Sequence, residues 1–245
     1  MSVLTLLLAG PLQSWGASSR FVRRTTESAP TKSGVIGLLA AAQGIDRNDE
    51  AGLARLAALR FAVRIDQPGT RQRDFQTAHH AVTGKAMPLT ERFYLCDAVF
   101  VAAVEGDDAF ISTLRDALRA PVYLSYLGRR SCPPARPVDL GLHPEDGLHQ
   151  ALECEPWQAA RWYQRTRRRD AQVDLVTLLE CPDGTGESLR DQPLSFSNAH
   201  RRHALRTYTS STVRVTNPLG SDPRHAGRRS VAPPHDPFSS LEEDA

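Results

Sequence analysis

The chain has 245 residues, of which 40% are apolar, and its formal net charge is +2. That apolar fraction supports a folded core and excludes an intrinsically disordered protein. No apolar run approaches the roughly 20 residues of a membrane-spanning helix, and the four cysteines are isolated, with no Cys-x-x-Cys pair for zinc or redox chemistry. We therefore expect a cytoplasmic protein with reduced cysteines, no metal, no cofactor and no membrane partner.

Arginine dominates the positive charge. Of 30 basic side chains, only Lys32 and Lys85 are lysines. Guanidinium groups bind phosphates and base edges through paired hydrogen bonds and stack on bases, although a GC-rich genome would also favour arginine codons. Seven arginines lie between residues 196 and 230 beside a single acid. A second group comprises Arg161, Arg165, Arg167, Arg168 and Arg169. Such segregated charge favours one basic face and a nucleic-acid partner.

The first half of the chain predicts strands and helices in alternation, from its apolar periodicity and from helix-capping residues. The predicted elements are a buried strand at 3–9 (too short for a signal peptide), a helix from Thr31 or Ser33 to Gly44, a short helix from Asp49, a strand at 61–65, a strand at 93–104, a helix from Asp107 or Asp108, and a strand at 122–127. Their order is the βαββαβ order of an α+β, ferredoxin-like domain, which RNA-recognition modules also use.

The rest of the chain divides by composition. Residues 67–91 are polar, without a clear period, and too long for an ordinary loop, so they are a candidate functional insertion. We expect residues 1–137 to form the ferredoxin-like domain. Residues 138–217 then form a smaller β-rich region with strands at 174–179 and 208–215, and residues 218–245, rich in Pro, Gly and charge, form a disordered tail.

Three stretches carry residues that core filling alone does not require. In residues 8–16, glycines bracket Gln13, Ser14 and Trp15, which would let backbone amides approach a ligand while the indole stacks on a base. The alternative is that Trp15 simply covers the core. In residues 30–39, Lys32 and Ser33 stand at a helix N-terminus, where an RNA phosphate could bind. The glycine spacing of a nucleotide P-loop is missing, and an ordinary helix cap is the alternative.

The third stretch is residues 123–133, in which a predicted strand delivers Arg129 and Arg130 through Gly128. This arrangement suits contacts to a nucleic-acid backbone, although exposed arginine pairs also occur on ordinary surfaces.

Taken together, these stretches resemble the CasD family, the RAMP-type subunit at the 5′ end of the type I-E Cascade complex. The resemblance lies in residues 8–16, 30–45, 92–98 (RFYLCDA) and 126–134 (YLGRRSCPP). It runs in good register from residue 3 to about 137 and more loosely to about 217. The region after residue 140 departs most from the family, and the tail after 217 is an addition of this chain.

The resemblance implies a RAMP domain that binds the 5′ handle of the CRISPR guide RNA (crRNA). The insertion would be a thumb-like hairpin that wedges into the guide and touches the backbone subunit CasC. The large subunit CasA and the other Cascade subunits would be further partners, with target DNA met only through the complex. The expected RNA-binding residues are Gln13, Ser14, Trp15, Arg20, Arg23, Arg24, Lys32, Ser33, Arg71, Arg73, Arg129 and Arg130.

Two other functions stay open. Metal-free RNA cleavage needs a general base and a general acid, and His79, His80 and Lys85 lie close together in the insertion. Adjacent histidines in a polar loop are also commonly solvated, and in type I-E systems a separate subunit cuts the repeat. Type I-C relatives cut the repeat themselves, so a CRISPR-repeat endoribonuclease is the first alternative to a non-catalytic subunit. A structural adaptor that contacts only protein is the second.

Overall fold

A computed structural model describes residues 1–17, 23–197 and 199–221 of the chain. Its main layer is a seven-stranded sheet in which every strand is antiparallel to its neighbours. From edge to edge the strands are β10 (Glu187–Ser195), β11 (Arg202–Thr216), β9 (Gln172–Glu180), β4 (Arg60–Gln67), β7 (Val99–Gly106), β1 (Ser2–Ala9) and β8 (Asp139–Pro144).

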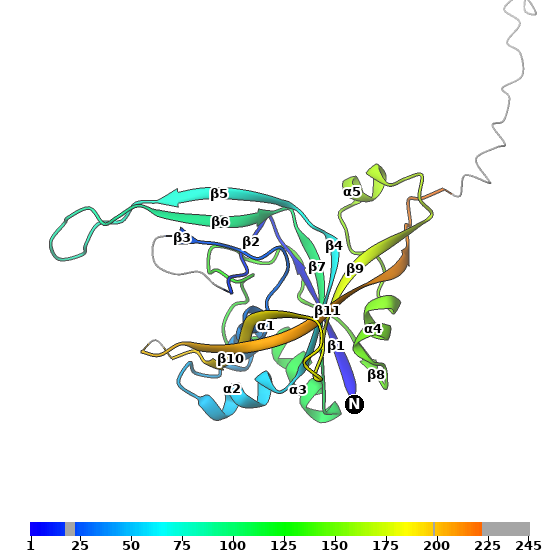
Figure 1. The fold of residues 1–245 in the computed structure, drawn as a ribbon, viewed down its shortest axis with the longest axis horizontal. Coiled ribbons are helices and arrows are strands. Elements are labelled where there is room, and N and C mark those ends of the chain that lie inside the picture. The colour runs from blue at the N-terminus through cyan, green and yellow to red at the C-terminus, as the bar shows by residue number, and fades with distance from the viewer. Residues whose placement is uncertain (18–22, 198, 222–245) are drawn as a thin grey trace, which may run out of the picture.

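A smaller, four-stranded sheet projects to one side of the main sheet (Figure 1). Its strands are β2 (Leu12–Gln13), β3 (Arg23–Arg24), β5 (Thr70–Gln76) and β6 (Thr90–Cys96). β6 is the central strand, with β5 along one edge and the short strands β2 and β3 along the other.

Helices cover both faces of the main sheet. Leu4, Leu6 and Leu8 of β1 lie in the large core that α1 and α3 cover, whereas Val3 packs with α4 on the opposite face. β1 is therefore buried along its whole length, which explains why its sequence is apolar except for Ser2 and Thr5. The helices are α1 (Lys32–Gln43), α2 (Glu50–Ala57), α3 (Asp108–Arg119), α4 (Leu148–Cys154) and α5 (Arg161–Thr166). Within the described residues, no helix is both long and apolar enough to cross a membrane.

The helix ends predicted from capping residues are confirmed. The side chain of Thr31 accepts a hydrogen bond from the Gly34 amide at the start of α1, and Gly44 ends that helix with a left-handed φ of 75°. Asp49 caps α2, and Asp107 caps α3. Because these caps act within one turn of their own helix, local sequence suffices to place them.

The strand predicted at 122–127 is wrong. The amides of Val122 and Tyr123 donate to the carbonyls of Ala42 and Ala41, so this segment caps the last turn of α1 and forms no ladder. Val122 and Leu124 are 64% and 86% exposed. The strand that follows α3 is instead β8, which pairs with β1 at the edge of the main sheet.

The single strand predicted at 93–104 is two strands, β6 and β7, which belong to different sheets. The chain turns between them at Asp97, whose φ is 55°. The predicted strands at 174–179 and 208–215 are confirmed as parts of β9 and β11, while β10 was missed. Residues 138–217 therefore add strands to both edges of the main sheet, β8 beside β1 and β9 beside β4.

Candidate nucleic-acid interface

The hairpin of β5 and β6 begins in the predicted insertion at 67–91 and ends beyond it, at Cys96. Seven residue pairs join its strands, from Thr70 opposite Cys96 to Gln76 opposite Thr90, and all of β5 is exposed. The hairpin leaves the main sheet at Gly69, where φ is 70° and a Cβ atom would lie 2.4 Å from the Cys96 carbonyl oxygen. Only glycine fits that turn. This turn directs the chain from β4 of the main sheet into the hairpin.

One face of the hairpin is basic. Arg71, Arg73 and Phe75 of β5 stand opposite Leu95, Phe93 and Glu91 of β6, so all six share a face. Arg23 of β3 joins them, with its guanidinium 5.3 Å from the centre of the Phe93 ring. Glu91 is the acid among these residues; its carboxylate lies 3.4 Å from Arg73 and 3.9 Å from Arg23. Exposed pairs at such distances are weak, so this face keeps an excess of available positive charge.

The other face of the hairpin carries a second group of arginines. The guanidinium of Arg129 lies 4.8 Å from the centre of the Tyr94 ring, and its Nη2 donates to the backbone oxygen of Arg24. Arg92 neighbours Arg24 in the strand register and lies on the same side of β6 as Tyr94. The Nη1 of Arg129 and the Nε of Arg92 are buried but have no acceptor among the described residues. Buried donors without partners are costly, and an acceptor such as a phosphate oxygen would lower that cost at either arginine.

Sequence reasoning missed Arg92. The signal was available, because an arginine two residues before Tyr94 must share its face in a strand. Arg130, in contrast, is exposed, and Arg20 lies outside the described residues.

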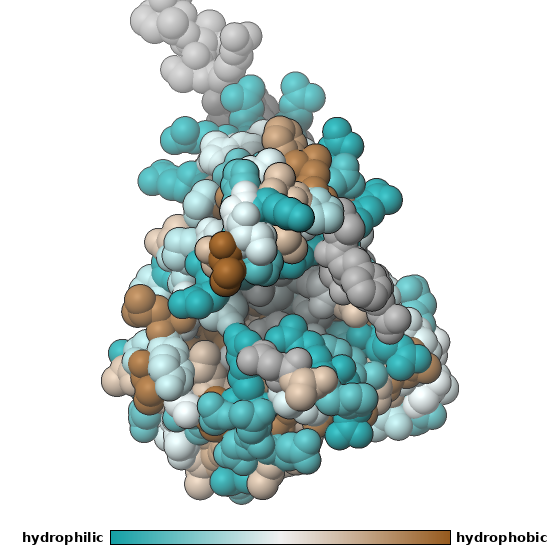
Figure 2. Space-filling model, turned by 90° about the vertical axis from the view of Figure 1, so that its left-hand side faces the viewer, coloured by the Kyte–Doolittle hydropathy of each residue, from teal (hydrophilic) through white to brown (hydrophobic). Residues whose placement is uncertain are grey.

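The surface between the hairpin and the β10–β11 lobe is hollowed. Figure 2, which looks at the hairpin from its tip, shows this recess below the hairpin. The hairpin itself carries four exposed apolar side chains, those of Phe75, Val82, Met87 and Leu89. Basic and apolar groups alternate on such a surface in proteins that bind single-stranded nucleic acids.

Residues 8–16 do not offer the stacking surface predicted for Trp15, because its indole ring is completely buried. The ring nitrogen donates to Gln13 Oε1, and Gln13 Nε2 in turn donates to the backbone oxygens of Leu8 and Ala98. Ser14 is also buried and donates to the Phe93 oxygen in β6. The alternative interpretation, in which Trp15 covers the core, is therefore the correct one for its side chain.

This buried loop instead fixes the position of Arg129. The Ser14 amide donates to the Leu127 oxygen, and a Cβ atom on Gly128 would lie only 1.8 Å from the Ser14 oxygen. Gly128 also has a left-handed φ of 83°. The glycine is therefore needed to bring the Leu127–Arg129 backbone against the loop and to direct Arg129 onto Tyr94.

The predicted anion site at the start of α1 is filled by the protein itself. The Lys32 amide donates to the Asp191 carboxylate at 2.7 Å, and Arg206 holds the same carboxylate through two hydrogen bonds. Lys32 Nζ lies 2.8 Å from Glu180. Burial lowers the pKa of Lys32, and the Glu180 carboxylate opposes that shift. Lys32 and Ser33 are both buried, so the prediction that they face an RNA phosphate is wrong for this structure.

The chain is similar to known CRISPR-associated proteins. Residues 3–209 match the family model of CRISPR-associated protein (Cas_Cas5). The chain is 39% identical to the CRISPR system Cascade subunit CasD of Escherichia coli (strain K12) over 174 residues, which are 63% of this chain and 78% of that protein. It belongs to this CRISPR-associated family. The resemblance to CasD seen in the sequence is thereby confirmed.

Two solved structures share the fold of this family member. One is described as a crystal structure of a Cas protein; it has a TM-score of 0.67, 34% identity, and coverage of 90% of this chain and 98% of its own. The other belongs to a CRISPR RNA-guided surveillance complex, with a TM-score of 0.71, 34% identity, and coverage of 92% and 95%. The mixed α/β fold with antiparallel sheets is therefore that of CRISPR-associated proteins.

The candidate catalytic residues lie at the hairpin tip. His79, His80 and Lys85 are exposed, and His79 forms a bridge with Ala86. The Nδ1 atom of His80 accepts hydrogen bonds from the amides of Val82 and Thr83, so it holds the turn together. Within the described ranges, no three His, Cys, Asp or Glu side chains come together as metal ligands would.

Proposed function

We propose that this family member is a non-catalytic subunit of a type I-E Cascade complex that binds the 5′ handle of the guide RNA. The observation that carries the proposal is the pair of arginine groups on the two faces of the β5–β6 hairpin. On one face, Arg71 and Arg73 outnumber the one nearby acidic residue, Glu91. On the other face, Arg92 and Arg129 each have a buried N–H group without an acceptor among the described residues. Both groups suit phosphate oxygens of an RNA strand that passes the hairpin.

The fold supports the same proposal. We interpret β1, α1, β4, β7, α3 and β8 as a ferredoxin-like βαββαβ unit, since β4–β7–β1–β8 are neighbours in that order in an antiparallel sheet. The hairpin would then be a thumb-like insertion between the second and third strands of this unit. The region from residue 138 would be a smaller addition that completes both edges of its sheet.

The relatives support a proposal for the partners of this chain. CasD of Escherichia coli is named a Cascade subunit, and a similar structure comes from an RNA-guided surveillance complex. We propose the backbone subunit CasC and the large subunit CasA as neighbours, with target DNA reached through the assembly. The exposed apolar side chains of the hairpin, such as Val82 and Met87, suit a protein contact at its tip.

A non-catalytic role is favoured over repeat cleavage by the state of the tip histidines. His80 Nδ1 is engaged by two backbone amides, and neither histidine has a carboxylate partner among the described residues that would orient it as a general base.

The test is to mix the purified chain with labelled CRISPR-repeat RNA in the absence of metal, and to follow binding and strand length together. We expect retention of intact RNA, both for the unmodified chain and for a His79→Ala/His80→Ala variant. One discrete shorter product that disappears in the variant would assign the endoribonuclease function instead. Absence of any RNA binding by the chain and by its complex would favour the protein-only adaptor.

A further inference from the structure

The arginines of α5 and the following turn are not used by the hairpin interface. Five of the nine residues from 161 to 169 are arginines, and all five are exposed. Arg167 pairs with Asp170 at 2.8 Å. The side chains of the other four, Arg161, Arg165, Arg168 and Arg169, meet no carboxylate within the part of the chain that the structure describes.

This clustering is unfavourable for the isolated chain. Arg161 and Arg165 are four residues apart on one helix, where like charges repel and destabilise the helix. Arg168 and Arg169 extend the same charge beyond the helix end. A surface that keeps four unpaired guanidinium groups together gains most when an anionic partner neutralises them.

An aromatic ring stands among these charges. Trp162 is 55% exposed, whereas the chain's other two tryptophans, Trp15 and Trp157, are 0% and 5% exposed. Its ring meets Tyr163 edge-to-face, with 5.7 Å between the ring centres and 88° between the planes. Arg165 follows Trp162 by three residues on α5, so the two side chains are neighbours on the helix surface. A half-exposed indole beside a guanidinium group is a combination on which an unpaired base stacks while its phosphate is held.

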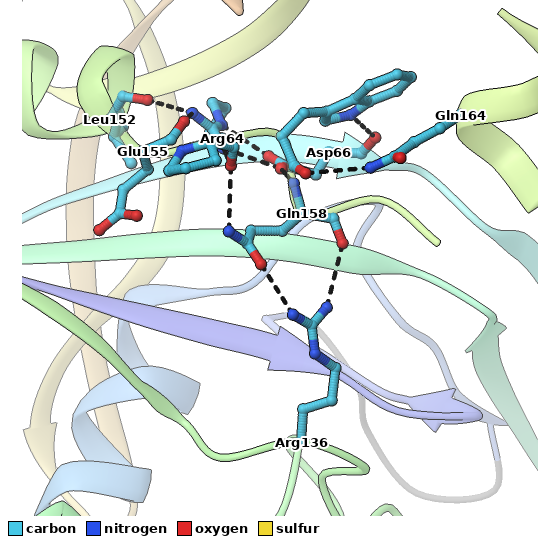
Figure 3. Close-up of polar contacts among 9 residues, drawn as sticks. Arg64, Asp66, Arg136, Leu152, Glu155, Gln158 and Gln164 are labelled. Atoms are coloured by element: carbon cyan, nitrogen blue, oxygen red, sulfur yellow. Dashed lines mark hydrogen bonds and ion pairs between the residues drawn. The ribbon is translucent and has the colours of Figure 1, made fainter. Parts of the chain in front are cut away.

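The surface is rigidly attached to the sheet. Gln164 of α5 donates to the backbone oxygens of Trp157 and Ala159, and the indole of Trp157 donates to the Asp66 oxygen in β4. Asp66 is fixed in turn by an ion pair with the fully buried Arg64 (Figure 3). A binding surface held in place in this way loses little conformational entropy when a ligand arrives.

The surface lies beside the root of the hairpin. The Ala160 amide, directly before α5, donates to the side chain of Gln67, the last residue of β4. The hairpin strand β5 begins three residues later. Figure 1 shows α5 at the same end of the main sheet as the hairpin, but on the side away from its tip.

We propose that α5 and the turn through Arg169 form a second nucleic-acid-binding surface, which holds the backbone of a single strand and stacks one unpaired base on Trp162. This proposal is independent of RNA binding by the hairpin. The shared chemistry is a single-stranded phosphodiester, and either RNA or DNA can supply it.

The test uses the full chain, with fluorescein-labelled oligouridylate, oligothymidylate and a duplex DNA of equal length as probes. Dissociation constants are measured by anisotropy over a series of salt concentrations. Replacing all four unpaired arginines by glutamine (Arg161→Gln, Arg165→Gln, Arg168→Gln, Arg169→Gln) should weaken single-strand binding about tenfold or more. It should also make the salt dependence shallower by about 0.7 per lost phosphate contact. The matched control replaces the same four by lysine, and it should retain most of the salt dependence.

Trp162 gives a direct optical signal. Because the other indoles are buried, an unlabelled strand that stacks on Trp162 should quench tryptophan emission, and Trp162→Leu should abolish the quenching and weaken binding about fivefold or more. Tighter binding of oligouridylate would assign the surface to RNA, and tighter binding of oligothymidylate would assign it to a DNA strand.

The proposal is overturned if the four-glutamine variant binds both single strands with unchanged affinity and salt dependence. It is also overturned if only the duplex binds, or if the variant loses an acidic protein partner while its nucleic-acid affinity stays the same. Repeating the titrations in an Arg71→Glu/Arg73→Glu background separates this surface from the hairpin. Loss of hairpin binding alone would leave the α5 quenching intact.

Discussion

The loop at residues 10–16 and the β5–β6 hairpin differ in how they use their conspicuous residues. In the loop, glutamine, serine and tryptophan form hydrogen bonds with the protein and are buried. In the hairpin, Arg71 and Arg73 lie on the exposed strand β5. Arg92 of β6 has a buried N–H group without an acceptor among the described residues. The difference teaches that an unusual sequence motif in this family member builds the support, while plainer positions on the strands carry the charge for the ligand.

The largest effect should follow from removing the buried indole. Trp15→Ala should lower the free energy of unfolding by about 3–5 kcal/mol, because it leaves a cavity in the core and removes the hydrogen-bond donor to Gln13 Oε1. Urea unfolding followed by circular dichroism measures this change. Trp162→Ala is the matched control, and it should change stability by no more than about 0.5 kcal/mol because Trp162 is half exposed. Equal stability of the two variants would mean that the loop is not structural.

A smaller loss should follow at the glycine that joins the loop to Arg129. Gly128→Ala places a Cβ atom 1.8 Å from the Ser14 oxygen, with φ at 83°, so the backbone must move. We expect a loss of about 2 kcal/mol or more, together with weaker RNA binding as Arg129 shifts.

Gly84, at the hairpin tip, provides the comparison. Its φ is 66°, but a Cβ atom added there would meet nothing within 4 Å, so Gly84→Ala should cost only the local strain of about 1 kcal/mol. Equal losses at the two glycines would show that the contact with Ser14 does not matter.

The smallest effect concerns the reactivity of Cys132, which lies in the segment that follows Gly128. Cys132 is completely buried, and burial raises the pKa of its thiol, so little reactive thiolate forms near neutral pH. In a titration with a thiol reagent, exposed Cys154 should react at once, and Cys132 only after denaturant is added. A Cys132→Ser variant identifies the slow phase. Rapid labelling of Cys132 in the folded chain would contradict the packing of this segment.

The sequence predicted those parts of the fold that are determined locally. Helix caps such as Thr31 and Asp107 act within a few residues, so they were found. The strand predicted at 61–65 lies within β4, although β4 is buried on both faces and not on one. Apolar content at 122–127 indicated a strand, but whether a segment joins a ladder depends on a distant partner, and here the partner is the end of α1. The missed β10 is polar, contains Pro193 and pairs irregularly with β11.

For the candidate site, the family resemblance pointed to Arg71 and Arg73, and the stretch around Gly128 pointed to Arg129. The structure places Arg71 and Arg73 on β5 and Arg129 against Tyr94, and their role in RNA binding stays a prediction. Lys32 was misassigned because the carboxylate that occupies its site, Asp191, is 159 residues away along the chain. A helix N-terminus indicates an anion, but only the fold shows whether the protein supplies it.

The most direct test of the account is guide-RNA affinity after charge reversal on the hairpin and at its root. Arg71→Glu, Arg73→Glu and Arg129→Glu, combined in one chain and measured within the reconstituted complex at fixed salt, should weaken retention of the guide RNA about tenfold or more. Charge reversal of Arg115 and Arg119 in α3, which pair with Asp139 away from the hairpin, is the matched control and should leave retention unchanged. Retention of the guide by the triple variant at the level of this control would contradict the assignment of the hairpin as the RNA-binding surface.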